Sequence, residues 1–334
     1  MISNFTGHGI KGPTSITAGP DGALWFTNAN NNSVGRITTA GVVTKFTGAG
    51  IDYPQGITVG SDGALWFTNE HNKAIGRITM AGSVSNYTAS SINQPTGITA
   101  GPDGALWFTN SEDAAGGAPG SIGRITTSGV VSNFTGPYFK HPYAITPGSD
   151  GALWFANQGF AGPSSIGRIT TAGVVSNFTG TGIDSPFGIT AGPDGALWFT
   201  NANNPNSIGS ITTTGVVTNY TGTGTVGPIG ITAGPDGALW FTNNSNNSIG
   251  SATVPAPALM SVSPTSGAVG AKLTITGTAL EGATSVTVNG VPAAIIKDQA
   301  TKIKITVPTG ATTGKIDVTT PSGTGVGATD FAVT

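Results

Sequence analysis

The sequence predicts an all-β protein, in which a six-bladed β-propeller precedes a small immunoglobulin-like β-sandwich. All six tryptophans occupy one position of a repeated phrase, DGALWFTN or once DGALWFAN, and are separated by 41, 41, 47, 44 and 42 residues. A period of about 40 to 45 residues with several short strand patterns per copy is typical of propeller blades. The repeat stops near residue 254. We therefore expect the propeller at residues 1–254, a linker at 255–257 and the sandwich at 258–334.

Each copy of the repeat is predicted to form four strands. In the first copy, the turn phrase GPDG precedes ALWFT, VGRITT follows a polar loop, and VVTKFT follows Ala40-Gly41. Neighbouring side chains of a strand point to opposite faces, so Leu24 and Phe26 face away from Trp25. Apolar side chains on both faces indicate a strand covered on both sides. We expect the tryptophans to be buried between blades.

The chain also contains a segment suited to closing the ring. The fourth-strand phrase occurs six times, but its first copy, Asn4-Phe5-Thr6, precedes the first tryptophan and no copy follows Trp240. We therefore expect residues 2–6 to pair beside residues 248–254 and to complete the last blade, which leaves no unpaired edge there. Removal of residues 1–7 would then open that edge.

Composition excludes several classes of function. Charged residues make up 8% of the chain, and the formal net charge is −2. Such a chain lacks the basic field that nucleic acid binding requires. It has no apolar run near 18 residues, and its first residues lack a signal-peptide pattern. The absence of cysteine excludes disulfides and thiolate metal sites.

The C-terminal segment has the alternating pattern of about six or seven short strands. Its phrases SPTSG, LTITGTAL, VTVNG and the closing DFAVT resemble an IPT/TIG domain, an immunoglobulin-like module. The resemblance implies a spacer or binding unit of an extracellular bacterial protein.

The repeats resemble the streptogramin lyase family, also called virginiamycin B lyase-like, through P-x-G-I-T-x-G-x-D-G-A-L-W-F-T-N and the following S-I-G-R-I-T. That family implies a seven-bladed propeller and a metal-assisted elimination that opens a cyclic peptide antibiotic, with a His directly after the repeated Pro and a Glu after W-F-T. The residues after the Pro are Thr14, Gln55, Thr96, Tyr143, Phe187 and Ile229, and Asn follows W-F-T or W-F-A in every copy. Asn cannot act as the base that an elimination needs. We therefore predict no catalytic residue, metal or cofactor.

One region offers an alternative to this prediction. His71, Glu70, Asp52 and His141 lie in loop types that emerge on the same face of a propeller. Imidazole and carboxylate groups that converge there could hold a divalent metal or act in a divergent lyase or hydrolase. Solvated loop residues are the simpler interpretation, because no ligand spacing supports a site.

The copies differ most in the third and fourth repeats. The segment from Asn28 to Val34 is six residues long, whereas Asn110 to Ile122 spans twelve and Asn157 to Ile166 spans nine. Aromatic side chains accompany these longer loops and form a plausible recognition surface. Our candidate ligand-binding residues are Tyr138, Phe139, His141, Tyr143, Phe160 and Phe187.

These observations favour a non-catalytic binding or scaffold protein, extracellular or at the cell surface, whose propeller face recognises a glycan, peptide or protein. A divergent streptogramin lyase-like enzyme that acts on a cyclic peptide and a structural subunit of a surface assembly are the alternatives. Other copies of the chain, or neighbouring domains of a larger surface protein, are the further partners that we consider. We expect no nucleic acid partner and no membrane span.

Overall fold

The computed structural model describes residues 9–111, 120–159, 162–203, 206–280, 282–299, 301–320 and 322–334. Apart from the short 3-10 helix η1 (Ala29–Asn31), the regular secondary structure of the described residues consists of β-strands. The chain forms two compact units: one extends to Gly188 without residues 148–150, and the other holds those three residues and Ile189 onward. No helix in the described ranges is long and apolar enough to cross a membrane.

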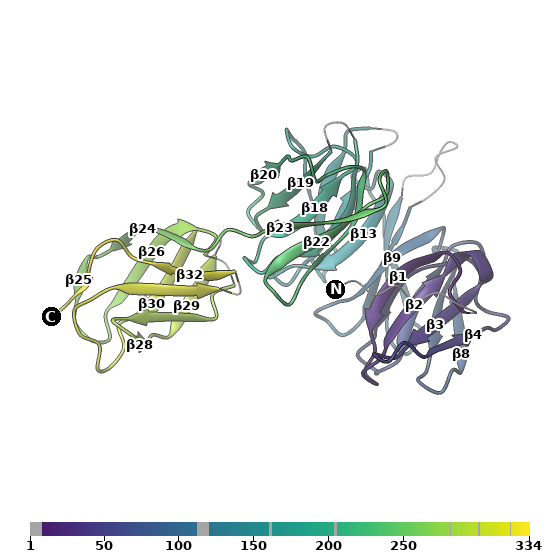
Figure 1. The fold of residues 1–334 in the computed structure, drawn as a ribbon, viewed down its shortest axis with the longest axis horizontal. Coiled ribbons are helices and arrows are strands. Elements are labelled where there is room, and N and C mark those ends of the chain that lie inside the picture. Colours follow the sequence, from purple (N-terminus) through teal and green to yellow (C-terminus); the bar gives the residue numbers. More distant parts are fainter. Residues whose placement is uncertain are drawn as a thin grey trace. The chain divides into compact units, whose positions relative to one another are not determined.

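Each repeat forms one antiparallel sheet, with its strands hydrogen-bonded in chain order (Figure 1). Five of these sheets have four strands, and the sixth has three strands among the described residues. We number the sheets 1 to 6 along the chain. The sheets are β1 (Pro13–Ala18), β2 (Leu24–Asn28), β3 (Ser33–Ile37) and β4 (Val43–Phe46); β5 (Pro54–Val59), β6 (Leu65–Asn69), β7 (Ala74–Ile78) and β8 (Val84–Thr88); β9 (Pro95–Ala100), β10 (Leu106–Asn110), β11 (Ser121–Ile125) and β12 (Val131–Phe134); β13 (Pro142–Pro147), β14 (Leu153–Asn157), β15 (Ser165–Ile169) and β16 (Val175–Phe178); β17 (Pro186–Ala191), β18 (Leu197–Asn201), β19 (Ser207–Ile211) and β20 (Val217–Tyr220); and β21 (Pro228–Ala233), β22 (Ala238–Asn243) and β23 (Ser248–Thr253).

The described strands confirm the all-β class and the repeated four-strand sheet of a propeller. The expected closing strand at residues 2–6 lies outside the described residues. Its pairing beside residues 248–254 therefore stays a prediction.

Tryptophans form the apolar contacts between successive sheets. Trp25, Trp66, Trp107, Trp154 and Trp198 are at most 1% exposed. Trp107 shows the pattern, because it packs with Leu153 and Phe155 of sheet 4 and stacks on Phe134 of its own sheet at 5.3 Å between ring centroids. The apolar faces of sheets 2, 3, 4 and 6 are each covered in this way by the tryptophan of the preceding sheet.

The expectation that all six tryptophans are buried is wrong for Trp240, which is 41% exposed. No outer strand of this sheet is among the described residues, and within them no aromatic ring stacks on Trp240 as one does on each of the other five tryptophans.

The repeated aspartate of the G-x-D-G turn connects the turn to the sheet. In sheet 2, Asp62 Oδ1 accepts a hydrogen bond from the Trp66 indole at 3.0 Å, and Asp62 Oδ2 accepts one from Arg77 Nε at 2.7 Å. Arg77 also lies over the Trp66 ring, at 5.9 Å from its centroid. The repeated arginine therefore makes a cation–π contact with the tryptophan ring and a charged hydrogen bond with the aspartate of the turn.

Sheet 5 keeps the aspartate but has Ser210 where the arginine stands in the earlier sheets. Burial raises the pKa of Asp194, against the opposing hydrogen bond from the Trp198 indole. At Asp62, burial also acts to raise the pKa, but the hydrogen bonds from Trp66 and Arg77 outweigh it and the pKa lies below its ordinary value of 3.8. The same repeat position thus has pKa shifts of opposite sign.

We expect Asp62→Asn to destabilise the protein by about 1 kcal/mol at neutral pH, because a hydrogen bond between charged groups is lost. Asp194→Asn should be neutral or stabilising, because the amide oxygen can still accept from Trp198 and no buried charge remains. Stability from Asp62 is present above the unfolded pKa and lost as the pH falls through the lowered folded pKa. For Asp194 the pH dependence has the opposite sign, because its folded pKa is raised. Ionisation of this carboxyl group lowers the free energy of unfolding once the pH rises above the pKa of the group in the unfolded chain.

Urea unfolding of the parent and both variants at neutral and acidic pH measures this difference. Equal destabilisation by the two substitutions at neutral pH would contradict it.

Threonine hydroxyls connect successive sheets at the ends of the second strands. Thr27, Thr68 and Thr109 donate to the carbonyls of Gln55, Thr96 and Tyr143 in the next sheet, at 2.6, 2.7 and 2.6 Å. Sheet 4 has Ala156 at this position, so its side chain cannot donate to the corresponding carbonyl, that of Phe187.

We expect Ala156→Thr to stabilise the protein by about 1 kcal/mol, the net value of one added hydrogen bond. The matched change Thr109→Ala should lower stability by a similar amount or more, since it leaves the Tyr143 carbonyl without this donor. Chemical denaturation of both variants measures the two effects. If the Ala156→Thr variant is no more stable than the parent, the extra methyl and hydroxyl groups do not fit.

The C-terminal domain begins with β24 (Ala258–Ser263) and has the two-sheet core of an immunoglobulin-like fold. Buried aliphatic residues and Phe331 fill this core. The further strands are β25 (Ser266–Gly267), β26 (Lys272–Thr278), β27 (Ser285–Val288), β28 (Val291–Pro292), β29 (Ile295–Gln299), β30 (Lys302–Thr306), β31 (Ile316–Thr320), β32 (Gly323–Val326) and β33 (Ala332–Val333). The sequence predicted six or seven strands, which matches the longer ones; β25, β28 and β33 have only two residues each.

Candidate functional site

Three variable residues meet at one edge of each repeated sheet. They stand directly before the repeated Pro, directly after it, and directly after the Asn of W-F-T-N or W-F-A-N. In sheets 2, 3 and 4, the backbone N–H of the third residue donates to the carbonyl of the first: Glu70 to Tyr53 at 3.3 Å, Ser111 to Gln94 at 3.2 Å, and Gln158 to His141 at 3.2 Å. We call the residues at these positions in sheets 2 to 4, together with Phe187, the variable edge: Tyr53, Gln55, Glu70, Gln94, Thr96, Ser111, His141, Tyr143, Gln158 and Phe187.

The backbone of this edge adopts an uncommon conformation. Tyr53, Gln94, His141 and Ser185, each directly before the repeated Pro, have φ of 49, 45, 59 and 47°. The left-handed region costs a non-glycine residue on the order of 1 kcal/mol or more and is concentrated at functional sites. Side-chain contacts stabilise it at Tyr53, whose N–H donates to Asn32 Oδ1 at 2.9 Å. The backbone conformation at these four residues therefore determines the direction in which each of their side chains leaves the edge.

The inner strands of sheets 2, 3 and 4 lie very close together at this edge. A Cβ added to Gly56 would approach the Thr96 carbonyl oxygen to 2.7 Å, and one added to Gly97 would clash with the Tyr143 carbonyl oxygen. These glycines allow the strands to approach, and the hydroxyls of Thr68 and Thr109 fix the contact. The variable residues of the three sheets are thus held side by side.

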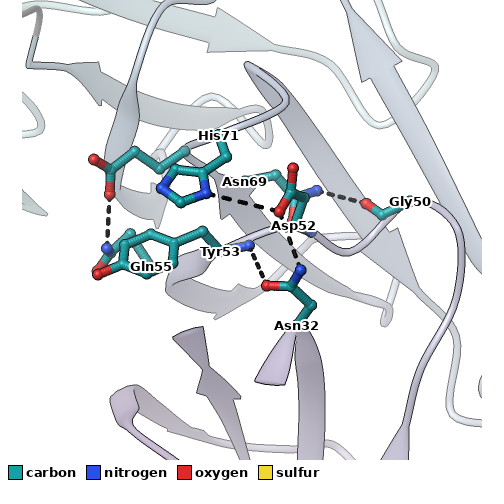
Figure 2. Close-up of polar contacts among 8 residues, drawn as sticks. Asn32, Gly50, Asp52, Tyr53, Gln55, Asn69 and His71 are labelled. Carbon is teal, nitrogen blue, oxygen red and sulfur yellow. Dashed lines mark hydrogen bonds and ion pairs between the residues drawn. The ribbon is translucent and has the colours of Figure 1, made fainter. Parts of the chain in front are cut away.

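His71 follows Glu70 and lies at the margin of the edge. Figure 2 shows its ring against that of Tyr53; the centroids are 4.2 Å apart and the planes differ by 6°. Its Nδ1 is 3.8 Å from Asp52 Oδ1, which also accepts from Asn32 Nδ2 at 3.1 Å. The His71 side chain is 58% exposed. His71 and Asp52 thus form a loose surface pair.

Glu70 supplies the negative charge of the variable edge. Its Oε2 accepts from Gln55 Nε2 at 2.7 Å. Burial raises the pKa of Tyr143, and the charge of Glu70 on sheet 2 raises it further. Burial lowers the pKa of His141, although a hydrogen bond with Gln158 and the charge of Glu70 act in the opposite direction. Sheets 2 and 4 therefore share one electrostatic environment, in which His141 is neutral at neutral pH.

Two of the predicted ligand-binding residues form a pair on this edge. The half-buried rings of Tyr143 and Phe187 are 4.6 Å apart in an edge-to-face arrangement, and Phe187 follows the next repeated Pro. His141 is also on the edge. Tyr138 is 48% exposed, but it lies in the loop between β12 and β13, away from the positions beside the Pro.

The structure corrects the prediction for Phe139, which is fully buried. Its ring packs 5.6 Å from that of Phe155 in the core between sheets 3 and 4, so it has no surface to offer a ligand. Phe160, the remaining predicted residue, lies outside the described residues.

The proposed convergence of His71, Glu70, Asp52 and His141 is found only in part. Asp52 contacts His71 and Glu70 acts on His141, but the described residues contain no group of three or more His, Asp or Glu side chains that could hold a metal ion. The neutral imidazole of His141 and the carboxylate of Glu70 are the groups of this edge that can accept a proton.

The residue after the Pro is recognisable from the sequence as a position that varies, but the repeat pattern did not predict that Tyr53, Gln55 and Glu70 belong to one edge. Aligning the six repeats and marking every position that varies within the constant phrase would have found them. The sheets of the second unit carry Ala202, Gly227, Ile229 and Asn244 at these positions. Aromatic, ionisable and amide side chains are therefore concentrated in sheets 2 to 4 and at Phe187.

The repeated sheets and their variable edge define a propeller-type repeat protein. The family model for the virginiamycin B lyase family matches residues 4–162 and 141–280, and the IPT/TIG domain model matches residues 257–333. The chain thus belongs to the virginiamycin B lyase family and carries a C-terminal IPT/TIG domain.

Solved structures agree with this assignment. A streptogramin B lyase is 32% identical, with a TM-score of 0.65, over 75% of this chain and 86% of that one. The virginiamycin B lyase from Staphylococcus aureus is 31% identical, with a TM-score of 0.64, over 88% of this chain and 94% of that one. A putative gluconolactonase at 16% identity and a TM-score of 0.54, covering 73% of this chain and 88% of that one, shows the fold alone. A search of curated proteins found no match.

Proposed function

We propose that this protein is a non-catalytic, extracellular or cell-surface binding protein that recognises its ligand at the variable edge. The main support is the contrast between a nearly constant framework and the varied side chains of this edge. Near-identical sheets offer equivalent surfaces, so specificity requires positions where they differ. Tyr53, Tyr143 and Phe187 supply rigid rings, and Gln55, Gln94 and Gln158 supply amides. Such a set binds a ligand by stacking and hydrogen bonding.

The test is a binding screen of peptide antibiotics, glycans and cell-wall fragments with the parent protein and a Tyr143→Ala, Phe187→Ala double variant. We expect the double variant to weaken binding at least about 30-fold, as the loss of two aromatic contacts of about 1 kcal/mol or more each implies. A matched double variant, Val130→Ala with Val174→Ala, removes two side chains that are 62% and 63% exposed elsewhere and should bind normally. Unchanged binding by the aromatic double variant would refute the site.

Family membership favours one other candidate, a divergent lyase that acts on a cyclic peptide. One S. aureus structure is described as a catalytically inactive histidine-to-alanine variant of virginiamycin B lyase with quinupristin, and this chain is 29% identical to it over 94% of its own length and 93% of that one, with a TM-score of 0.65. The described histidines here are His71 and His141. Streptogramin turnover by the parent that is lost in His141→Ala would establish this alternative, whereas no turnover by the parent supports the binding function.

A further inference from the structure

The variable edge contains one formally charged side chain at neutral pH. Its other members are aromatic, amide or hydroxyl residues, and His141 is neutral because burial lowers its pKa. No described Lys or Arg lies within ion-pair distance of Glu70. Within the described part of the chain, its charge is therefore not neutralised by a Lys or Arg side chain.

The Glu70 carboxylate is held in place from one side only. Gln55 Nε2 donates to its Oε2 at 2.7 Å, and no described residue donates to its Oε1. The backbone hydrogen bond from Glu70 to the Tyr53 carbonyl fixes the start of the side chain. Glu70 is half-buried, so a carboxylate oxygen remains available in a partly dehydrated place where charge attraction is stronger than in water.

Aromatic rings accompany this carboxylate. Tyr53 belongs to the same sheet edge. Tyr143, whose ring packs edge-to-face on Phe187, lies on the inner strand of sheet 4, which the Thr109 hydroxyl joins to sheet 3 as the Thr68 hydroxyl joins sheet 3 to sheet 2. Aromatic faces attract cations through their quadrupole, and aromatic side chains are the usual partners of substituted ammonium groups. A carboxylate beside such rings suits a cation better than a neutral or anionic group.

We propose that the variable edge binds a substituted ammonium group of the ligand between the Glu70 carboxylate and the ring of Tyr143. This inference rests on the proposed binding function and narrows it to ligands that carry an organic cation. Gln55 orients the carboxylate, and Phe187 supports the Tyr143 ring.

Choline and its neutral isostere 3,3-dimethylbutan-1-ol are the probes that test the inference. They have the same shape and differ in charge at one atom, so their dissociation constants, measured by ligand-observed NMR on the full chain, isolate the charge. We expect choline to bind the parent at least about tenfold more tightly, the effect of a modest cation–π and charge interaction. Glu70→Gln keeps the hydrogen bond with Gln55 and should abolish the preference.

Two further variants complete the test. Asp330→Asn removes one carboxylate from the C-terminal domain, where Asp330 pairs with Lys315 at 3.1 Å, and gives the same change in net charge. It should retain the preference for choline. Tyr143→Leu, which keeps an apolar side chain without the aromatic face, should reduce the preference several-fold.

Equal binding of the two probes by the parent, or a choline preference that survives Glu70→Gln, would overturn the inference. Failure of the binding function itself has a different signature, in which the wider screen yields no ligand that depends on Tyr143 and Phe187. Binding of a neutral ligand that does depend on Tyr143 and Phe187 would support the proposed binding function. It would contradict the inference that the ligand carries a cation.

Discussion

Replacing Trp107 by Ala should lower the free energy of unfolding by about 3 to 5 kcal/mol, the range for deleting a large core aromatic. The ring has no exposed surface and fills the contact between sheets 3 and 4. Its indole N–H also donates to Asp103 Oδ1 at 3.0 Å, and Arg124 lies 6.0 Å from the ring centroid. The substitution therefore leaves a cavity and deprives a partly buried carboxylate of a donor.

Trp240 provides the matched control within the same chain. It stands at the equivalent repeat position, and its indole also donates to an aspartate, Asp236, at 3.1 Å, but the residue is 41% exposed. Trp240→Ala should cost about 2 kcal/mol, less than Trp107→Ala, because part of the Trp240 surface is already exposed to water. Chemical denaturation of both variants measures the difference. A loss of about 3 kcal/mol or more at Trp240 would mean that this face is covered in solution.

The architecture was predictable because the repeat is nearly exact. The tryptophan period predicted one sheet per copy, and the alternation of LWF predicted burial on both faces of the second strand. Trp240 was misassigned because the repeated phrase is the same in all six copies, whereas the outer strand that supplies the stacked ring in the other five sheets is not among the described residues of sheet 6. Burial depends on the strands that pack around the ring, and this is a property of the assembly of repeats rather than of the phrase.

The candidate site was predictable only in part. Tyr143 and Phe187 were found because they are aromatic residues that accompany the longer loops of the third and fourth repeats. Phe139 was included on the same ground, but the aromatic rings of loops fill cores as readily as they line surfaces. Glu70 was assessed as a metal ligand rather than as a partner of Gln55. Their contact depends on the backbone hydrogen bond between Glu70 and Tyr53, which the sequence does not encode in any recognisable motif.

Replacing Gly123 by Ala should destabilise the protein by about 2 to 3 kcal/mol, although it adds a single methyl group. Gly123 pairs with Phe108 across β10 and β11, and the Phe108 ring lies over the glycine, where an added Cβ would clash with it. Phe108 is fully buried against sheet 2, together with Leu106 and Trp66, so its ring has nowhere to move. The glycine of S-I-G-R-I is thus required by the phenylalanine of L-W-F.

Gly222 is the matched control, because a Cβ added there meets no atom within 4 Å. Gly222→Ala should leave stability unchanged or raise it slightly by restricting the unfolded chain. The double variant Gly123→Ala, Phe108→Leu should recover part of the loss relative to Gly123→Ala, since the smaller side chain makes room for the methyl group. A double-mutant cycle from urea unfolding measures this coupling, and strictly additive losses would show that the clash is relieved elsewhere.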